Sequence, residues 1–74
     1  MNFVEVDAKG LEPKLAIAIA KRALMISCGK PVIITLDSAE SKDKVMEFAE
    51  GRKLSCVASE QDGCYRLVIE KKVS

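Results

Sequence analysis

The apolar residues of this chain follow a strand-like spacing in four segments and a helix-like spacing in two. Residues 3–6 form a short β-type run, and strand alternation places Val4 and Val6 on one face. Residues 32–36 are apolar on both alternating sets, which is typical of a central strand. The helix-like segments are residues 13–28 and about 38–50, so strand, helix, strand and helix follow one another.

The segment 13–28 is rich in strong helix formers, and Pro13 suits its first turn because an N–H there has no intrahelical partner. Apolar residues at three- and four-residue steps predict an inner stripe made of Leu15, Ala16, Ile19, Ala23 and Ile26. Gly29 is expected at the C′ position, and Pro31 prevents the helix from resuming.

The second helix is expected to begin at a serine cap, either Ser38 or Ser41, and to end near Glu50. Its inner face is predicted to carry Val45, Phe48 and Ala49. Gly51 is expected to close it.

The last third of the chain predicts a β-hairpin, with strands at residues 53–60 and 64–72 joined by the turn Asp62-Gly63. Pairing outward from this turn sets Gln61 opposite Cys64, Glu60 opposite Tyr65, and Ala58 opposite Leu67. One face, the predicted core, carries Leu54, Cys56, Ala58, Tyr65, Leu67 and Ile69. The other face, expected to be wet, carries Ser55, Ser59, Cys64, Arg66 and Glu70. A slip by one residue would bury charged side chains, which supports this register.

These elements predict a two-layer α/β (α+β) sandwich of order β-α-β-α-β-β, in which two helices cover one face of a four-stranded mixed sheet. We expect one domain, residues 1–74. Val57 and Val68 give the uncovered face some apolar surface beside Cys64 that suits self-association. We therefore expect a monomer or a weak homodimer.

The turn between the first strand and the first helix is the main candidate for function. Gly10 can take the positive φ that a tight turn often needs. Glu12 is expected at or beside the N-cap, where the orphan amides and the helix dipole stabilise a carboxylate. Asp7 can orient the turn by accepting hydrogen bonds from nearby amides.

The turn resembles the loop of the TusA/SirA-like family of sulfur-carrier proteins, whose pattern is D-x-x-G-L-x-C-P-x-P. Asp7, Gly10, Leu11 and Pro13 match this pattern. The chain is one residue shorter before Pro13 and has no cysteine there. Leu15 occupies the position of the second proline. The resemblance continues in Gly29-Lys30, Leu36-Asp37, Asp43-Lys44-Val45 leading to Phe48, and Asp62-Gly63-Cys64-Tyr65-Arg66.

The resemblance implies the same two-layer sandwich. It also implies a role in sulfur relay, in which the family's cysteine takes sulfur as a persulfide and passes it to a protein partner. The expected partner-docking residues are Asp7, Lys9, Gly10, Leu11, Glu12, Pro13 and Lys14. Lys9 and Lys14, with Lys21 and Arg22, are expected to form a basic rim around the loop.

Composition excludes several other function classes. Twelve Lys and Arg against eleven Asp and Glu give a net charge of +1, which does not favour nucleic acid or an anionic membrane. The chain contains no histidine, its cysteine spacings fit no zinc pattern, and Gly10 belongs to no phosphate loop, so we expect no metal or cofactor and no His-assisted nucleophile. It shows no signal peptide and no apolar run of transmembrane length, so we expect a cytoplasmic protein.

The three cysteines are an odd number without a C-x-x-C pair, which favours free thiols in a reducing compartment. Cys28 is expected near the carbonyl end of the first helix, which disfavours a thiolate. Cys56 is expected in the core, and Cys64 on the exposed face is the best remaining sulfur acceptor.

Three hypotheses remain open. The first is a binding protein that keeps the family's docking surface without its cysteine, and the second is a sulfur-relay protein that uses Cys64 or another thiol. The third is an interaction module with no link to sulfur. Under any of them, Glu12 can act simply as the helix cap.

Overall fold

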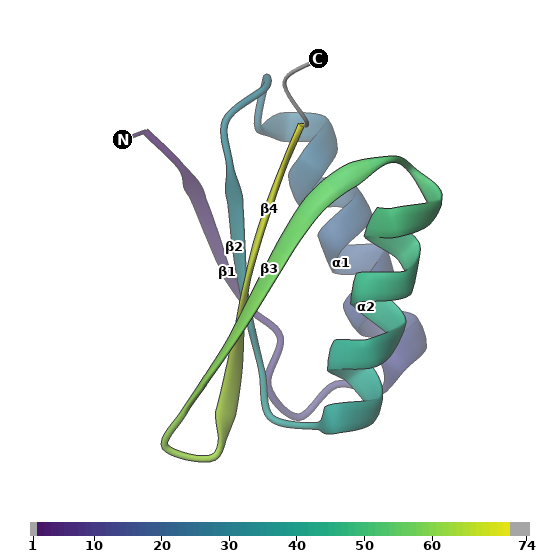
Figure 1. The fold of residues 1–74 in the computed structure, drawn as a ribbon, viewed down its shortest axis with the longest axis vertical. Helices are drawn as coiled ribbons and strands as arrows, with labels where there is room; N and C mark the ends of the chain where they lie inside the picture. Colours follow the sequence, from purple (N-terminus) through teal and green to yellow (C-terminus); the bar gives the residue numbers. More distant parts are fainter. Residues whose placement is uncertain (1, 72–74) are drawn as a thin grey trace.

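The computed structural model describes residues 2–71 and has the predicted order of elements (Figure 1). The elements are β1 (Val4–Asp7), α1 (Pro13–Ile26), β2 (Val32–Leu36), α2 (Ala39–Gly51), β3 (Leu54–Gln61) and β4 (Cys64–Lys71). Both helices lie on the same side of the sheet, so the chain is an α+β two-layer sandwich, as the hydrophobic pattern predicts.

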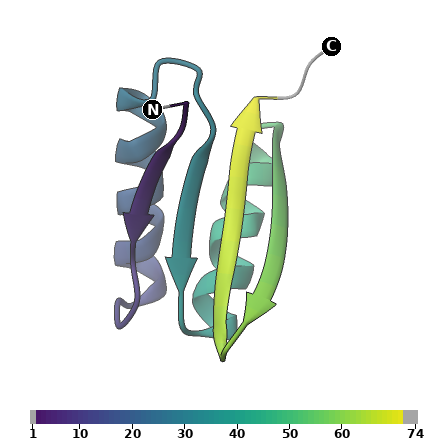
Figure 2. The ribbon, with the colours of Figure 1, turned by 90° about the vertical axis from the view of Figure 1, so that its left-hand side faces the viewer.

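The four strands form one mixed sheet in the order β1-β2-β4-β3 (Figure 2). β1 and β2 are parallel, as a helical crossover requires, and the other neighbours are antiparallel. β2 therefore lies in the middle of the sheet, and Val32, Ile33, Ile34 and Leu36 are all buried. This confirms the central strand that residues 32–36 predict.

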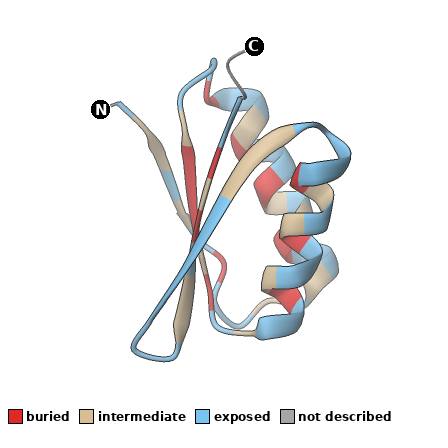
Figure 3. Cartoon of the chain, viewed as in Figure 1, coloured by how far each residue is buried: buried red, intermediate tan, exposed pale blue. Residues whose placement is uncertain are grey.

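The core lies between the sheet and the helices (Figure 3). Its sheet side consists of the fully buried Ile34, Leu36, Leu67 and Ile69. Its helix side consists largely of small residues, namely Ala16 and Ala20 from α1 and Val45 and Ala49 from α2. Small side chains at the contact let helices approach closely, so this thin layer still excludes water.

The buried stripe of α1 differs from the predicted one. It consists of Ala16, Ala20, Ala23 and the C-cap residue Ser27. Leu15 and Ile26, assigned to the stripe by their hydrophobicity, are 51% and 65% exposed. The correction follows from spacing, because the buried positions recur at steps of four, three and four, and the two larger residues project from the flank of that stripe.

Both helices end differently from the prediction. α1 stops two residues early: Ser27 is its C-cap, and Cys28 takes the first left-handed position with φ 54°, followed by Gly29 with φ 89°. The Ser27 hydroxyl donates to the Leu24 carbonyl at 3.0 Å and so satisfies an orphan acceptor of the last turn. Gly51, expected just after α2, is instead its last helical residue, and Arg52 is the C-cap.

The N-terminus of α2 agrees with one of the two predicted caps. The Ser38 hydroxyl oxygen accepts a hydrogen bond from the Ser41 N–H at 3.3 Å, so Ser38 is the N-cap. Neither helix of residues 2–71 combines the length and the apolar character that spanning a bilayer requires.

The hairpin register is confirmed residue by residue. Gln61 faces Cys64, Glu60 faces Tyr65 and Ala58 faces Leu67. One predicted core residue is wrong: Ala58 is exposed, because the half of β3 near the hairpin turn leads away from α2 (Figure 3). The predicted last residue of β4, Lys72, lies outside the described residues.

Candidate functional site

The loop between β1 and α1 lies at the same end of the molecule as the connection from β2 to α2 (Figure 1). Gly10 has φ 79°, which confirms the positive φ expected there. Its N–H donates to both carboxylate oxygens of Asp37, at 3.0 and 3.1 Å. Asp37 comes directly after β2, so this bond fastens the loop to the central strand.

Three further hydrogen bonds fix the loop. The Asp7 carboxylate accepts from the Lys9 N–H at 3.0 Å, as an Asx turn does. The N–H of the buried Ala8 donates to the carbonyl of Thr35, at 2.8 Å. The buried hydroxyl of Ser41 donates to the Leu11 carbonyl at 3.3 Å. The backbone is therefore held from β2 and α2 as well as from within the loop.

Glu12 is the N-cap residue of α1, and Pro13 is the first helical residue, as predicted. The Glu12 carbonyl accepts the first intrahelical bond, from the Ala16 N–H at 2.9 Å. Its carboxylate makes no capping hydrogen bond. Glu12 thus presents an exposed negative charge at the positive end of the helix dipole.

The side chains that point outward from this fixed backbone define what we call the loop surface: Lys9, Glu12, Lys14 and Leu15. Lys9, Glu12 and Lys14 are exposed, as the sequence suggests. Leu15 is the residue that sequence reasoning missed, because its hydrophobicity placed it in the core. The available signal was its place in the first turn of the helix, directly after Lys14 and three residues after Glu12.

The predicted basic rim does not gather in one place. The Lys21 ammonium lies 6.0 Å from the centre of the Phe48 ring on α2. Arg22 lines an apolar groove between α1 and β1 that includes Val6 and Ile26. Lys9 lies on a different side, at the edge of the uncovered sheet face. Lys9, Lys21 and Arg22 therefore do not form a single patch around the loop.

Cys64 lines a hollow of about 270 Å³ at the loop end of the uncovered sheet face. The same hollow contains Lys9 from the loop, Thr35 from β2 and Arg66 from β4. The Arg66 guanidinium is also 3.8 Å from the Glu5 carboxylate. Asp62 also lines this hollow, so the half-buried thiol of Cys64 has partial access among side chains of both charges. The sequence placed Arg66 on the same face as Cys64 but did not indicate Lys9.

The other two thiols are less suited to chemistry. Cys56 packs against the core, and burial, together with the negative charge of Glu50, raises the pKa of its thiol. Cys28 is exposed in the turn after α1. All three cysteines are free, and Cys56 faces Ile69 rather than Cys64, which agrees with the expected lack of a disulfide between them.

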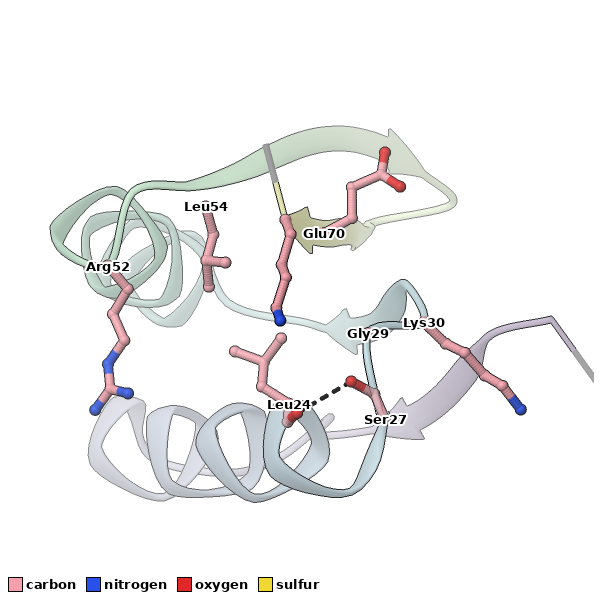
Figure 4. A pocket seen from close by; sticks show the side chains of 8 residues that line it. Leu24, Ser27, Gly29, Lys30, Arg52, Leu54 and Glu70 are labelled. Carbon is pink, nitrogen blue, oxygen red and sulfur yellow. Dashed lines mark hydrogen bonds between the residues drawn. The ribbon is translucent and has the colours of Figure 1, made fainter. Parts of the chain in front are cut away.

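A second hollow, of about 160 Å³, lies at the other end of the molecule, between the ends of both helices and the strands β3 and β4 (Figure 4). Leu24 and Leu54 point toward each other across it, whereas Lys30 points away. None of the loop residues and no cysteine lines it. Across residues 2–71, no three His, Cys, Asp or Glu side chains form a group that could hold a metal ion.

Comparison with known proteins points to one family. No protein-family model matches this chain, and no curated protein matches it by sequence. Among solved structures, it is similar to a SirA-like protein from Desulfitobacterium hafniense, with a TM-score of 0.83 and 26% sequence identity over 90% of this chain and 95% of that one. This fold and the loop motif of Asp7, Gly10, Leu11 and Pro13 together support the SirA/TusA-like family for this chain.

Proposed function

We propose that this protein is a docking member of a sulfur-relay system, which binds a protein partner through the loop surface and carries no persulfide at the usual position. The observation that carries this proposal is Glu12. Its carboxylate is exposed at the N-terminus of α1 and makes no capping hydrogen bond, where the family pattern has a cysteine beside the helix.

A cysteine and a glutamate at this position differ in the chemistry that they can perform. Sulfur transfer needs a thiolate that attacks the outer sulfur of a donor persulfide, so that a new S–S bond forms and the donor leaves as a thiolate. The helix N-terminus favours this by lowering the pKa of a thiol. A carboxylate cannot form that bond. At the same position it keeps the negative charge of the thiolate, and can pair with a lysine or arginine of the partner.

The fixed backbone of the loop suits recognition. The bonds from Gly10 to Asp37 and from Ser41 to Leu11 order the loop before any partner arrives. Binding therefore has little backbone entropy left to lose. Leu15, half exposed beside Glu12 and Lys14, supplies the apolar contact that a small charged surface needs for affinity.

Sulfur loading tests this proposal. The protein is incubated with a cysteine desulfurase and cysteine, and the intact mass is read for an added sulfur atom. A variant with one cysteine inserted between Glu12 and Pro13 restores the length and the thiol of the family pattern, and a variant with alanine inserted there is the matched control. We expect only the cysteine variant to gain sulfur. A parent protein that gains sulfur overturns the proposal.

A second candidate function rests on the hollow around Cys64. Cys64 is a free, half-buried thiol that opens into this hollow beside the loop residue Lys9, so a sulfur donor docked at the loop could reach it. In this version the protein is an active relay component that carries its persulfide on Cys64. The same assay distinguishes the two, because sulfur that loads onto the parent and disappears in Cys64→Ser would support the second function and contradict the first.

A further inference from the structure

The outer edge of β3 is long and unprotected. β3 is the last strand of the sheet, and no element of residues 2–71 covers its outer side in Figure 2. It pairs with β4 without interruption from Leu54 to Gln61, so it contains no bulge. It also contains no proline and no lysine, and Glu60 is its one charged residue. Proteins usually protect an edge strand with one of these features, whereas the opposite edge, β1, is simply short.

The hairpin turn determines which groups of β3 are free to pair. Asp62 and Gly63 both have positive φ, 53° and 78°, so the turn is of type I′. The pair that closes it, Gln61 and Cys64, is then hydrogen-bonded, and every second residue of β3 bonds to β4. The backbone N–H and C=O groups of the residues between them point outward. These residues are Leu54, Cys56, Ala58 and Glu60.

In one antiparallel register, the outward-pointing residues of one copy pair only with the outward-pointing residues of a second copy. If two copies meet about a two-fold axis at Val57, Leu54 faces Glu60 of the second copy and Cys56 faces Ala58 of the second copy. All outward residues then lie in hydrogen-bonded pairs, each of which exchanges two bonds. If the axis moves by one residue, one outward-pointing residue at an end of each β3 faces a residue that is not part of β3 in the second copy. That residue then has no hydrogen-bonded pair within the joined strands.

The charges around β3 fit the same arrangement. Arg52 and Lys53 precede the strand, and Glu60 and Asp62 lie at its other end, while residues 54–59 carry no charge. Antiparallel pairing brings the basic start of one copy beside the acidic end of the other, and symmetry repeats the contact. A second copy of the same strand therefore meets complementary charge at both ends.

Val57 supplies the apolar centre. It is 63% exposed and lies on the sheet face that the helices leave uncovered. On the two-fold axis it would face its counterpart in a non-hydrogen-bonded pair, where opposite side chains are closest. We propose that two copies of this chain associate through β3 in the register centred on Val57, which joins their sheets into one. The loop surface, next to β1, would remain free at both outer edges of that sheet.

Sedimentation equilibrium of the parent and two lysine variants tests the proposal. Val57→Lys places two like charges opposite each other on the axis, and we expect the dimer dissociation constant to rise at least about tenfold. Leu15→Lys makes the same chemical change at an exposed site away from β3 and should alter the constant by less than about twofold. A parent that stays monomeric, or a Val57→Lys variant that associates like the parent, overturns the proposal.

Disulfide trapping tests the register. In a background of Cys28→Ser, Cys56→Ser and Cys64→Ser, a cysteine introduced by Val57→Cys meets its counterpart at a Cα separation of about 4.5 Å, within reach of a disulfide. We expect mild oxidation to link this variant. The matched control Ser59→Cys should link only when it is mixed with Ser55→Cys, the residue that it faces. Linking of Ser59→Cys alone would overturn the register.

Discussion

The substitution Gly10→Ala tests whether the candidate loop depends on a left-handed backbone at residue 10. Gly10 has φ 79°, and a Cβ built there meets no atom within 4 Å, so the cost comes from the backbone alone. An L-residue in this conformation costs roughly 1–2 kcal/mol, and the reduced entropy of the unfolded chain offsets roughly 0.4–1 kcal/mol of it. We expect a net loss of about 0.8 kcal/mol at the middle of these ranges and about 1.6 kcal/mol at most, or a fall in Tm of roughly 3–13 °C.

Thermal unfolding followed by circular dichroism measures this loss. Gly51→Ala is the matched control, because Gly51 lies at the end of α2 without a positive φ and its Cβ also meets nothing within 4 Å. We expect the control to be stabilised by up to about 1 kcal/mol. Gly10→Val should cost about 1 kcal/mol or more, since a β-branched side chain tolerates this φ least. A Gly10→Ala protein that melts at or above the parent temperature would refute the reasoning.

Other substitutions test the remaining contacts. Asp37→Ala removes the acceptor of the Gly10 N–H and should lower the free energy of unfolding by about 1 kcal/mol in urea titrations, with an unchanged m-value. Ala20→Leu overfills a fully buried site between α1 and the sheet and should cost about 1–3 kcal/mol in the same assay. Because burial raises the pKa of Cys56, its thiol favours the folded state below the pKa of the unfolded chain, about 8.5, and this contribution disappears as the pH rises above that value. Stability measured from pH 7 to 10 should therefore fall, and Cys56→Ser should flatten the fall.

The sequence was most informative where a side-chain pattern has only one physical solution. Asp62-Gly63 requires positive φ at both positions, and a slip by one residue would bury charged side chains, so the register of β3 and β4 followed directly. The apolar run 32–36 likewise fits a central strand, because β2 lies between β1 and β4 and even Ile33, on the face that the helices leave uncovered, is buried.

The sequence was less informative where side-chain size determines burial and where contacts join residues that are far apart in the chain. Hydrophobicity alone favoured Leu15 and Ile26 for the buried stripe of α1, but the helix packs closely through alanines, and the larger side chains project outward. The bond from Gly10 to Asp37 joins residues that are 27 positions apart, so no local pattern reveals it. Lys9 and Cys64 line one hollow only because the fold brings the loop beside β4, and no local pattern in the sequence reveals this.

The most direct test of the central claim is a competition for sulfur in one reaction. The cysteine-insertion variant is mixed with a cysteine desulfurase, cysteine and an increasing excess of the parent, and intact masses follow both species over time. If the parent binds the donor through the loop surface without accepting sulfur, the variant should load more slowly as the parent increases, and the parent mass should not change. The same excess of Glu12→Lys, with its charge at the helix N-terminus reversed, should compete less. A parent that gains sulfur, or one that leaves the loading rate unchanged, would contradict the account.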